Sequence, residues 1–354
     1  MLSTIKSFSV GYNPINQSNT FTSGDCITGQ ITLELAKECE IYSLCVKLKG
    51  KAEVSWVELD GKKSKTYHAK EKYFSIKQVI IEESKGSINN QGCHVYPFTF
   101  QIPAQDLPSS FQDTYGKIVY TLEANLSRSM RADSKAKAQF TLRHNENLYS
   151  DPSLMIQQQD ITEKKLKLFS SGTVSMDANI ERTGFHQGEG IKVAASINNK
   201  SSRDIKPKYL LYMKISYFAK GKRKLDCKKI LKEVDDPIPP SANQAVTRVI
   251  TIPPDTCVSI LNCTILRVEY RLKVYLDVKY AVDPEIKFPV VILPALQGPD
   301  GEHLPAGSEA YAGSDMPGGT SFLQNPPASG PFATPPPYET HGMYPVLKDS
   351  TEKL

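Results

Sequence analysis

The sequence lacks the marks of several protein classes. Its seven cysteines are an odd number without a CxxC pair, which argues against a disulfide framework and favours reduced thiols. Cys227, Cys257 and Cys263 are too unevenly spaced, and too far from any histidine, to indicate a zinc site. The longest apolar run, Phe288–Leu296, is interrupted by prolines and falls short of the roughly 18 residues that span a membrane. The first ten residues show no apolar signal-peptide core.

Catalytic motifs are equally scarce. The chain has no Gly-x-Ser-x-Gly elbow, no phosphate-binding P-loop and no GxGxxG motif after a strand. The six histidines are dispersed, and His94 is next to Cys93 only in sequence. No nucleophile is paired with a base in any recognisable pattern. We therefore expect a protein that is not an enzyme and needs no cofactor or metal.

Charge is unevenly distributed along the chain. From Ala295 onward there are two lysines and seven acidic residues, so the rest of the chain holds 41 basic and 31 acidic groups. A basic body favours anionic lipid surfaces and acidic or phosphorylated peptides as partners. Nucleic acid is not expected, because the sequence has no recognition helix, zinc finger or basic-aromatic RNA motif.

The abundant feature is alternation of apolar and polar residues with a period of two, which predicts half-buried strands. It occurs at Ile31–Leu35, Leu44–Leu48 and Ile118–Leu126, and again at Ile191–Ile197 and Leu266–Val278. Turn residues separate these runs, and few segments favour a helix. Short strands with turn signals between them predict β-sandwiches.

The strand pattern and the composition divide the chain into four parts. Residues 1–145 and 169–294 are predicted to be two β-sandwich domains in tandem. Residues 146–168 read as a linker with a short edge strand at its end. Residues 295–354 are rich in proline and glycine and cannot bury enough apolar surface to offset the ordering entropy, so we expect a disordered tail.

Three local expectations accompany this division. Asp60-Gly61 is a hairpin-turn signal, and Pro108–Gln112 is the one segment expected to form a short helical turn. A basic run is expected at another hairpin tip. Two interpretations of this run stay open: a solvated loop, or a contact with anionic membrane or phosphate. It consists of Lys220, Lys222, Arg223 and Lys224.

The tail contains the motif Pro335-Pro336-Pro337-Tyr338. Consecutive prolines favour a polyproline II helix, which loses little entropy when it docks in the aromatic groove of a WW domain. In a PPxY motif the tyrosine fills a second pocket, so Pro335, Pro336 and Tyr338 are the predicted WW-binding residues. The alternative is a proline-rich linker that contains a tyrosine by chance.

A second tail motif, Tyr344-Pro345-Val346-Leu347, fits two short peptides. One is the Tyr-x-x-φ signal read by clathrin adaptors, and the other is the Tyr-Pro-x-Leu peptide read by ESCRT-associated factors. Tyr344 and Leu347 are therefore candidate sorting residues, with a chance match as the alternative.

Many segments in order resemble the alpha-arrestins, the arrestin domain-containing proteins, and the resemblance covers nearly all of residues 1–294. In the first half they are Ser23–Gly29, Leu48–Trp56, Tyr96–Phe100, Leu107–Phe111 and Tyr115–Tyr120. In the second half they are Gly184–Glu189, Asn198–Arg203 and Ile265–Tyr270. A PPxY motif after the second domain also fits this family, although many members carry two and this chain has one.

The resemblance implies an all-β fold of two immunoglobulin-like arrestin sandwiches and an adaptor function. Such an adaptor selects membrane receptors or transporters as cargo and recruits HECT-type E3 ubiquitin ligases through their WW domains. Ubiquitination, endocytosis and endosomal sorting of the cargo follow. Lys348 and Lys353 in the tail are candidate ubiquitin acceptors. The implied location is the cytoplasm, peripherally associated with plasma membrane and endosomes.

Two alternatives from other classes remain. One is a structural subunit of a sorting complex with an arrestin fold, which would recruit no ligase. The other is a thioredoxin-binding regulator, because one relative binds thioredoxin through a reactive cysteine. The corresponding region of this chain, near Asn243, holds no cysteine. Neither the cargo nor its phosphorylation can be read from the sequence.

Overall fold

The computed structural model describes most of the chain up to residue 296, and this part lies within one compact unit. The described ranges are 4–61, 63–82, 87–128, 131–145, 148–149, 151–166, 172–279 and 281–296. Among these residues, no helix is long and apolar enough to cross a membrane. The predicted disordered tail lies almost entirely outside the described residues.

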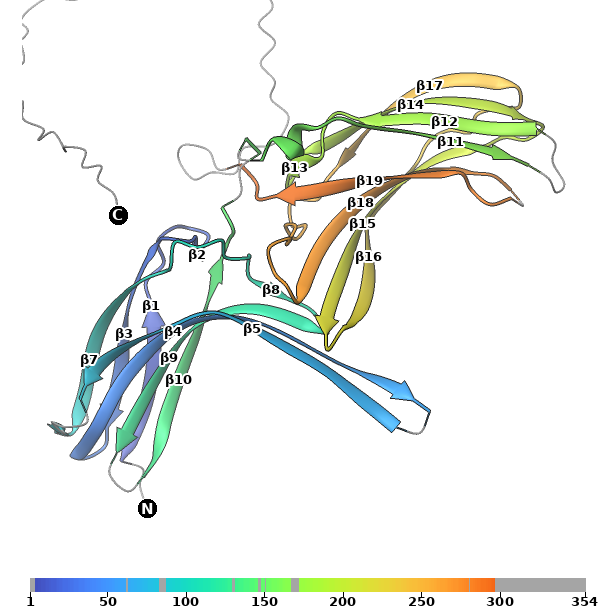
Figure 1. Ribbon diagram of the computed structural model, residues 1–354. Coiled ribbons are helices and arrows are strands. Elements are labelled where there is room, and N and C mark those ends of the chain that lie inside the picture. Colours follow the sequence, from blue (N-terminus) through green and yellow to red (C-terminus); the bar gives the residue numbers. More distant parts are fainter. Residues whose placement is uncertain are drawn as a thin grey trace, which may run out of the picture. The chain divides into compact units, whose positions relative to one another are not determined.

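The first domain is built from strands β1 to β10 (Figure 1). They are β1 (Ile5–Tyr12), β2 (Thr20–Phe21), β3 (Cys26–Leu35), β4 (Cys39–Asp60), β5 (Lys63–Ile81), β6 (Ser87–Asn89), β7 (Gly92–Gln101), β8 (Phe111–Gln112), β9 (Gly116–Arg128) and β10 (Arg131–Leu142). One sheet has the order β1-β3-β7. The other has the order β2-β10-β9-β4-β5, with β6 paired to β4 and β8 paired to β9.

Alternating side chains of these strands form the core between the two sheets. Ile31 and Leu33 of β3 are fully buried, as are Leu48 of β4 and Leu122 of β9. Their polar neighbours in sequence point to the opposite side, as the period of two requires. The strands predicted from Ile31, Leu44 and Ile118 are thereby confirmed.

The longest hairpin of the first domain joins β4 to β5. The two strands pair in antiparallel register from Leu44 opposite Ile81 to Asp60 opposite Lys63. Gly61, in the turn that Asp60-Gly61 predicted, has a left-handed φ of 60°. Glycine adopts this conformation without the steric cost that a side chain would bring.

The second domain is built from strands β11 to β19 (Figure 1). They are β11 (Gln158–Lys165), β12 (Gly172–Ile180), β13 (Gly184–His186), β14 (Gly190–Ser201), β15 (Lys206–Ala219), β16 (Lys222–Val234), β17 (Ala242–Thr251), β18 (Leu266–Asp277) and β19 (Glu285–Leu293). One sheet has the order β11-β12-β14-β17, and the other β13-β19-β18-β15-β16. The expected pair of all-β sandwiches is confirmed.

Strand β18 is the clearest case of a pattern that the sequence predicted correctly. Leu266, Val268, Leu272 and Val274 on its inner side are fully buried. The strand lies between β15 and β19 and is therefore a central strand of its sheet. Pairing with β15 and β19 supports a strand of twelve residues, and the alternation reflects one buried side and one more exposed side.

One local prediction was wrong, and one segment has more structure than expected. Phe111 and Gln112 form the short strand β8 instead of ending a helical turn at Pro108–Gln112, because they pair with Ile118 and Lys117 of β9. In the segment predicted as a linker, a 3-10 turn at Pro152–Met155 precedes β11, the edge strand of the second domain. All eight residues of β11 pair with β12.

Candidate functional site

The predicted tail sites lie outside the described residues, which end at residue 296. These sites are the WW-binding, sorting and ubiquitin-acceptor residues. They are Pro335, Pro336, Tyr338, Tyr344, Leu347, Lys348 and Lys353.

The predicted basic run lies at the tip of the hairpin formed by β15 and β16. Lys220 and Gly221 are the two turn residues, and both have positive φ, 49° and 71°. Two positive φ angles in a two-residue loop define a type I′ turn, whose twist matches that of the flanking strands. The tip therefore presents its cations at a fixed position.

Most cations of this tip bind other parts of the protein. Lys220 Nζ donates a hydrogen bond to the Thr66 carbonyl of β5 at 3.2 Å. Arg223 donates to Ser216 Oγ at 2.8 Å. Lys224 Nζ lies 4.4 Å from the centre of the Tyr115 ring, a cation–π contact. The hairpin tip is therefore part of a junction between the two domains.

Asp113 of the first domain is the charged centre of this junction. It accepts a hydrogen bond from the Tyr217 hydroxyl at 2.7 Å and another from Lys228 Nζ at 2.5 Å. Its side chain is 9% exposed. Burial alone would raise the pKa of Asp113, but the hydrogen bonds from Lys228 and Tyr217 outweigh it and hold the pKa below its usual value. Asp113 therefore joins the domains as a carboxylate.

A second polar cluster involves the edge strand β5. Glu71 accepts hydrogen bonds from the backbone amide and the hydroxyl of Thr264, at 3.0 and 2.6 Å. Tyr73 donates to Cys263 Sγ at 3.3 Å. Burial raises the pKa of the Cys263 thiol above its usual value, so this thiol stays protonated and can donate to Glu71, 3.7 Å away.

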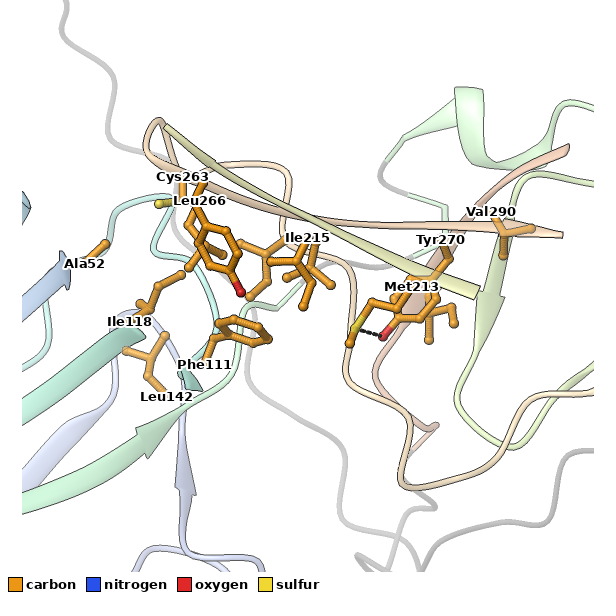
Figure 2. Close-up of a cluster of buried hydrophobic side chains, with 14 of the residues drawn as sticks. Ala52, Phe111, Ile118, Leu142, Met213, Ile215, Cys263, Leu266, Tyr270 and Val290 are labelled. Carbon is orange, nitrogen blue, oxygen red and sulfur yellow. Dashed lines mark hydrogen bonds between the residues drawn. The ribbon is translucent and has the colours of Figure 1, made fainter. Parts of the chain in front are cut away.

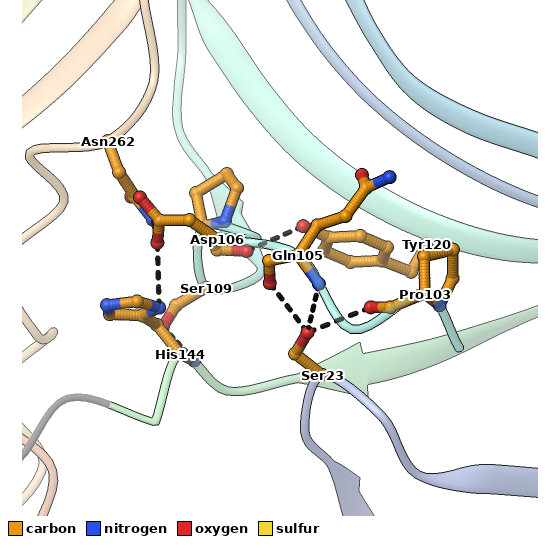
Figure 3. A network of polar contacts seen from close by, with 9 residues as sticks. Ser23, Pro103, Gln105, Asp106, Ser109, Tyr120, His144 and Asn262 are labelled. Atoms are coloured by element: carbon orange, nitrogen blue, oxygen red, sulfur yellow. Dashed lines mark hydrogen bonds and ion pairs between the residues drawn. The ribbon is translucent and has the colours of Figure 1, made fainter. Parts of the chain in front are cut away.

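The loop after β7 is held from both domains, as Figure 3 shows. Ser23 Oγ donates to backbone carbonyls of the loop, at 2.6 Å for Gln105. The buried Tyr120 hydroxyl donates to the Pro108 carbonyl at 2.7 Å. From the second domain, Asn262 donates to Asp106 at 2.7 Å. One of these contacts, from Tyr120 to Pro108, holds the start of the segment that was predicted to form a helical turn.

Apolar packing continues across the same junction (Figure 2). Ile118 of the first domain and Leu266 of the second belong to one buried cluster. A Cβ atom added to Gly116 would lie 2.8 Å from Leu266 Cδ1 and 2.9 Å from Tyr217 Cε1. Gly116 therefore permits an approach that any side chain would obstruct.

Thiols and carboxylates are among the reactive groups of the described residues. No group of three or more histidine, cysteine, aspartate or glutamate side chains could hold a metal within the ranges that the structure describes. Cysteines 26, 93 and 227 are exposed thiols, whereas Cys45 is buried. The acidic side chains of the junction, Asp113 and Glu71, are each engaged by hydrogen-bond donors from the second domain.

Sequence reasoning missed this junction entirely. Asp113 lies 115 positions from Lys228, and Glu71 lies 193 positions from Thr264. No periodic pattern links residues so distant in the chain. The local signal was Gly116 at the start of a predicted strand. A glycine in a strand can mark a place where another part of the protein approaches closely.

Comparison with known families identifies both halves of the fold. Residues 8–148 match the arrestin (or S-antigen) N-terminal domain, and residues 170–296 match the arrestin (or S-antigen) C-terminal domain. The chain therefore belongs to the arrestin family and is an adaptor-like protein.

Individual relatives place it among the alpha-arrestins. Arrestin domain-containing protein 4 of Mus musculus is 29% identical over 284 residues, which are 77% of this chain and 68% of the relative. The thioredoxin-interacting protein of Rattus norvegicus is 29% identical over 305 residues, 82% of this chain and 75% of the relative. The human thioredoxin-interacting protein is 27% identical over the same length. The resemblance to alpha-arrestins is thereby confirmed.

Proposed function

We propose that this protein is an adaptor that recruits HECT-type E3 ubiquitin ligases to membrane-protein cargo. The observation that carries the proposal is the order of its parts: two arrestin domains, followed by a PPxY motif at residues 335–338. The folded domains supply the surface that selects a receptor or transporter. The motif supplies the ligase contact, and ubiquitination then promotes endocytosis and endosomal sorting.

The chemistry of the motif supports WW domains as the ligase modules. Pro335 and Pro336 present preorganised rings to an aromatic groove, and Tyr338 adds an aromatic ring with a polar tip. A single peptide of this kind binds weakly, with a dissociation constant of about 10 μM, or roughly −7 kcal/mol. Avidity from a second contact, such as a shared cargo, would strengthen recruitment.

The test is capture of the full chain by immobilised WW domains of HECT-type ligases. Tyr338→Ala leaves the second pocket of the groove empty, so we expect capture to fall by at least about tenfold. Tyr344→Ala is the matched control, because it removes a tyrosine of the same tail outside the PPxY motif. Equal capture of wild type and Tyr338→Ala would reject ligase recruitment through this motif and favour a structural sorting-complex subunit.

The other tail residues have proposed roles in the same pathway. Tyr344 and Leu347 would bind clathrin adaptors or ESCRT-associated factors, and Lys348 and Lys353 would accept ubiquitin. The protein would act in the cytoplasm, peripherally bound at plasma membrane and endosomes. Internalisation of a cargo with Tyr344→Ala, and ubiquitin attachment with both lysines changed to arginine, test these roles separately.

Thioredoxin binding is a second candidate function, favoured by the similarity to thioredoxin-interacting proteins. Asn243, near which the reactive cysteine of that relative would fall, lies on β17, and this strand contains no cysteine. The exposed Cys26, Cys93 and Cys227 are the thiols available for such a contact. Calorimetric titration with reduced thioredoxin tests it: heat of binding that disappears on changing all three to serine supports this function, and no heat discards it.

A further inference from the structure

The outer side of the β10-β9-β4-β5 sheet carries a dense array of lysines, which we call the lysine face. These strands are neighbours in the first domain (Figure 1). Its nine lysines are Lys47, Lys49 and Lys51 of β4, Lys70, Lys72 and Lys77 of β5, Lys117 of β9, and Lys135 and Lys137 of β10.

Strand register places these lysines on one side of the sheet. Lys47 is opposite Lys77 on β5 and opposite Glu123 on β9. Glu123 is in turn opposite Lys137 on β10. Directly paired residues point to the same side of a sheet, so this row crosses four strands on one face. Lys51 opposite Lys72 belongs to a second row on the same face.

Charge on the lysine face is far from balanced. The carboxylates on or beside it are Glu53, Glu123 and Asp133. Glu123 pairs with Lys49 and, at 3.7 Å, with Lys137, and Glu53 pairs with Lys51 at 3.0 Å. No ion pair within the described residues involves the other six lysines of the face. These are Lys47, Lys70, Lys72, Lys77, Lys117 and Lys135.

Two of the cross-strand pairs on the lysine face lower the stability of the sheet. Like charges directly opposite each other destabilise a sheet, and this arrangement occurs at Lys47–Lys77 and at Lys51–Lys72. Folding alone gains nothing from these pairs. An anionic partner that covers the face would relieve the repulsion, so the arrangement points to binding.

The strand order and the chemistry of the face favour a membrane as this partner. Strands β4 and β9 are central in the sheet, so an extended peptide could be added as a new strand only beside the edge strand β5, where it would leave the lysines of β4, β9 and β10 uncovered. The nine positive charges counted on this face are all carried by lysines, compact hydrated point charges without the forked geometry by which arginine binds single phosphates. Val119 and Thr121 face outward between the lysines yet are buried, so the centre of the face projects no large apolar group, and the exposed Val57 and Val79 lie toward its ends.

We propose that the lysine face is the surface by which this protein binds a bilayer that contains anionic lipid. The proposal rests on the proposed adaptor function, for which it names the membrane-contacting surface. The hairpin tip from Lys220 to Lys224 is the less suitable surface, because most of its cations already bind the protein. Attraction to the bilayer would be diffuse and electrostatic, and therefore weakened by salt.

The test is co-sedimentation of the full chain with phosphatidylcholine vesicles that contain or lack phosphatidylserine. We expect binding only with phosphatidylserine, and loss of binding at high salt. The combined variant Lys72→Glu, Lys77→Glu and Lys135→Glu is expected to reduce binding at least about tenfold. A matched variant of β16, Lys222→Glu, Lys229→Glu and Lys232→Glu, has the same change of net charge and is expected to stay within about twofold of wild type.

Several outcomes would overturn the proposal. Equal losses in the two variants would show that net charge alone governs binding, and indifference to phosphatidylserine would remove lipid as the partner. If the wild type binds a soluble oligoglutamate peptide but does not sediment with vesicles, the face is a protein-docking surface. Circular dichroism and the thermal midpoint establish that each variant is folded. Lys→Gln at the same three positions removes the positive charges without adding negative ones, and should reduce binding less. No ligase or cargo is present, so this assay and the WW-domain assay fail independently.

Discussion

Two lysine-rich regions of this protein use their charge in opposite ways. At the tip of the β15–β16 hairpin, Lys220 and Lys224 contact Thr66 and Tyr115 of the other domain. On the lysine face, six lysines have no ion-pair partner among the described residues. The cations of the first region are close together in the sequence, and they help to hold the two domains together. The second is dispersed over four strands and leaves most of its lysines without an ion pair among the described residues. Density of charge in a sequence is thus a poor guide to which cations can bind a partner.

The largest expected effect comes from removing Tyr217, the aromatic residue that anchors the β15–β16 hairpin to the first domain. Tyr217 is fully buried, packs on Tyr115 and bonds Asp113. Tyr217→Ala should lower the free energy of unfolding by about 3–5 kcal/mol, because it leaves a cavity and removes one of the hydrogen bonds to the Asp113 carboxylate. Chemical denaturation measures the loss. Tyr217→Phe keeps the ring and should lose about 1–2 kcal/mol; a larger loss would mean that the hydroxyl matters more than the packing.

The next effect concerns the charge of the junction. Asp113→Asn keeps the side-chain shape but removes the charge partner of Lys228, and should cost about 1–3 kcal/mol at neutral pH. Because the folded-state pKa of Asp113 is depressed, its stabilising contribution is present above the ordinary aspartate pKa and is lost as pH falls through the folded value. Unfolding curves at several acidic pH values should therefore show wild type and variant converging. A gap that persists in strong acid would contradict the assignment.

A smaller effect separates two lysines within the hairpin tip. Lys224→Gln removes a cation–π contact with Tyr115 and should cost about 0.5–1 kcal/mol. Lys222 is exposed, and Lys222→Gln should change the free energy of unfolding by less than about 0.5 kcal/mol. Thermal unfolding of the pair in parallel gives the difference. Identical midpoints would show that the tip's cations are as free as those of the lysine face.

The smallest effect has the opposite sign. Lys77 is opposite Lys47, so Lys77→Gln should raise the free energy of unfolding by about 0.2–0.5 kcal/mol at low salt. Added salt should shrink the gain, because it screens the repulsion in the wild type. Denaturation of both proteins at two salt concentrations measures it. A loss of stability at low salt would indicate that Lys77 has a structural partner.

Much of the fold could be predicted from local pattern. The alternation from Leu266 to Val278 identified β18, and Asp60-Gly61 identified the β4–β5 turn, because each signal lies within a few residues. The error at Pro108–Gln112 has a physical cause: two residues there pair with β9, and tertiary pairing outweighs a local turn preference.

The candidate sites were harder to predict. The PPxY motif is contiguous and needs no fold to be recognised. The lysine face had a signal in the alternating Lys47, Lys49 and Lys51 and in the pair Lys135 and Lys137, but only the strand register shows that β5 and β10 lie on either side of β4 and β9. The junction through Asp113 depends on contacts more than 100 residues apart, which composition and periodicity do not encode.

The close approach at Gly116 has a consequence for fragments of this protein. Leu266 and Tyr217 cover the end of the first domain's core around Ile118, so a polypeptide cut after β10 would leave that end open to water. Such a fragment would expose apolar surface that the intact chain never presents, and self-association is its expected fate. The second half thus acts as a lid for the first, and the pair should melt as a single cooperative body.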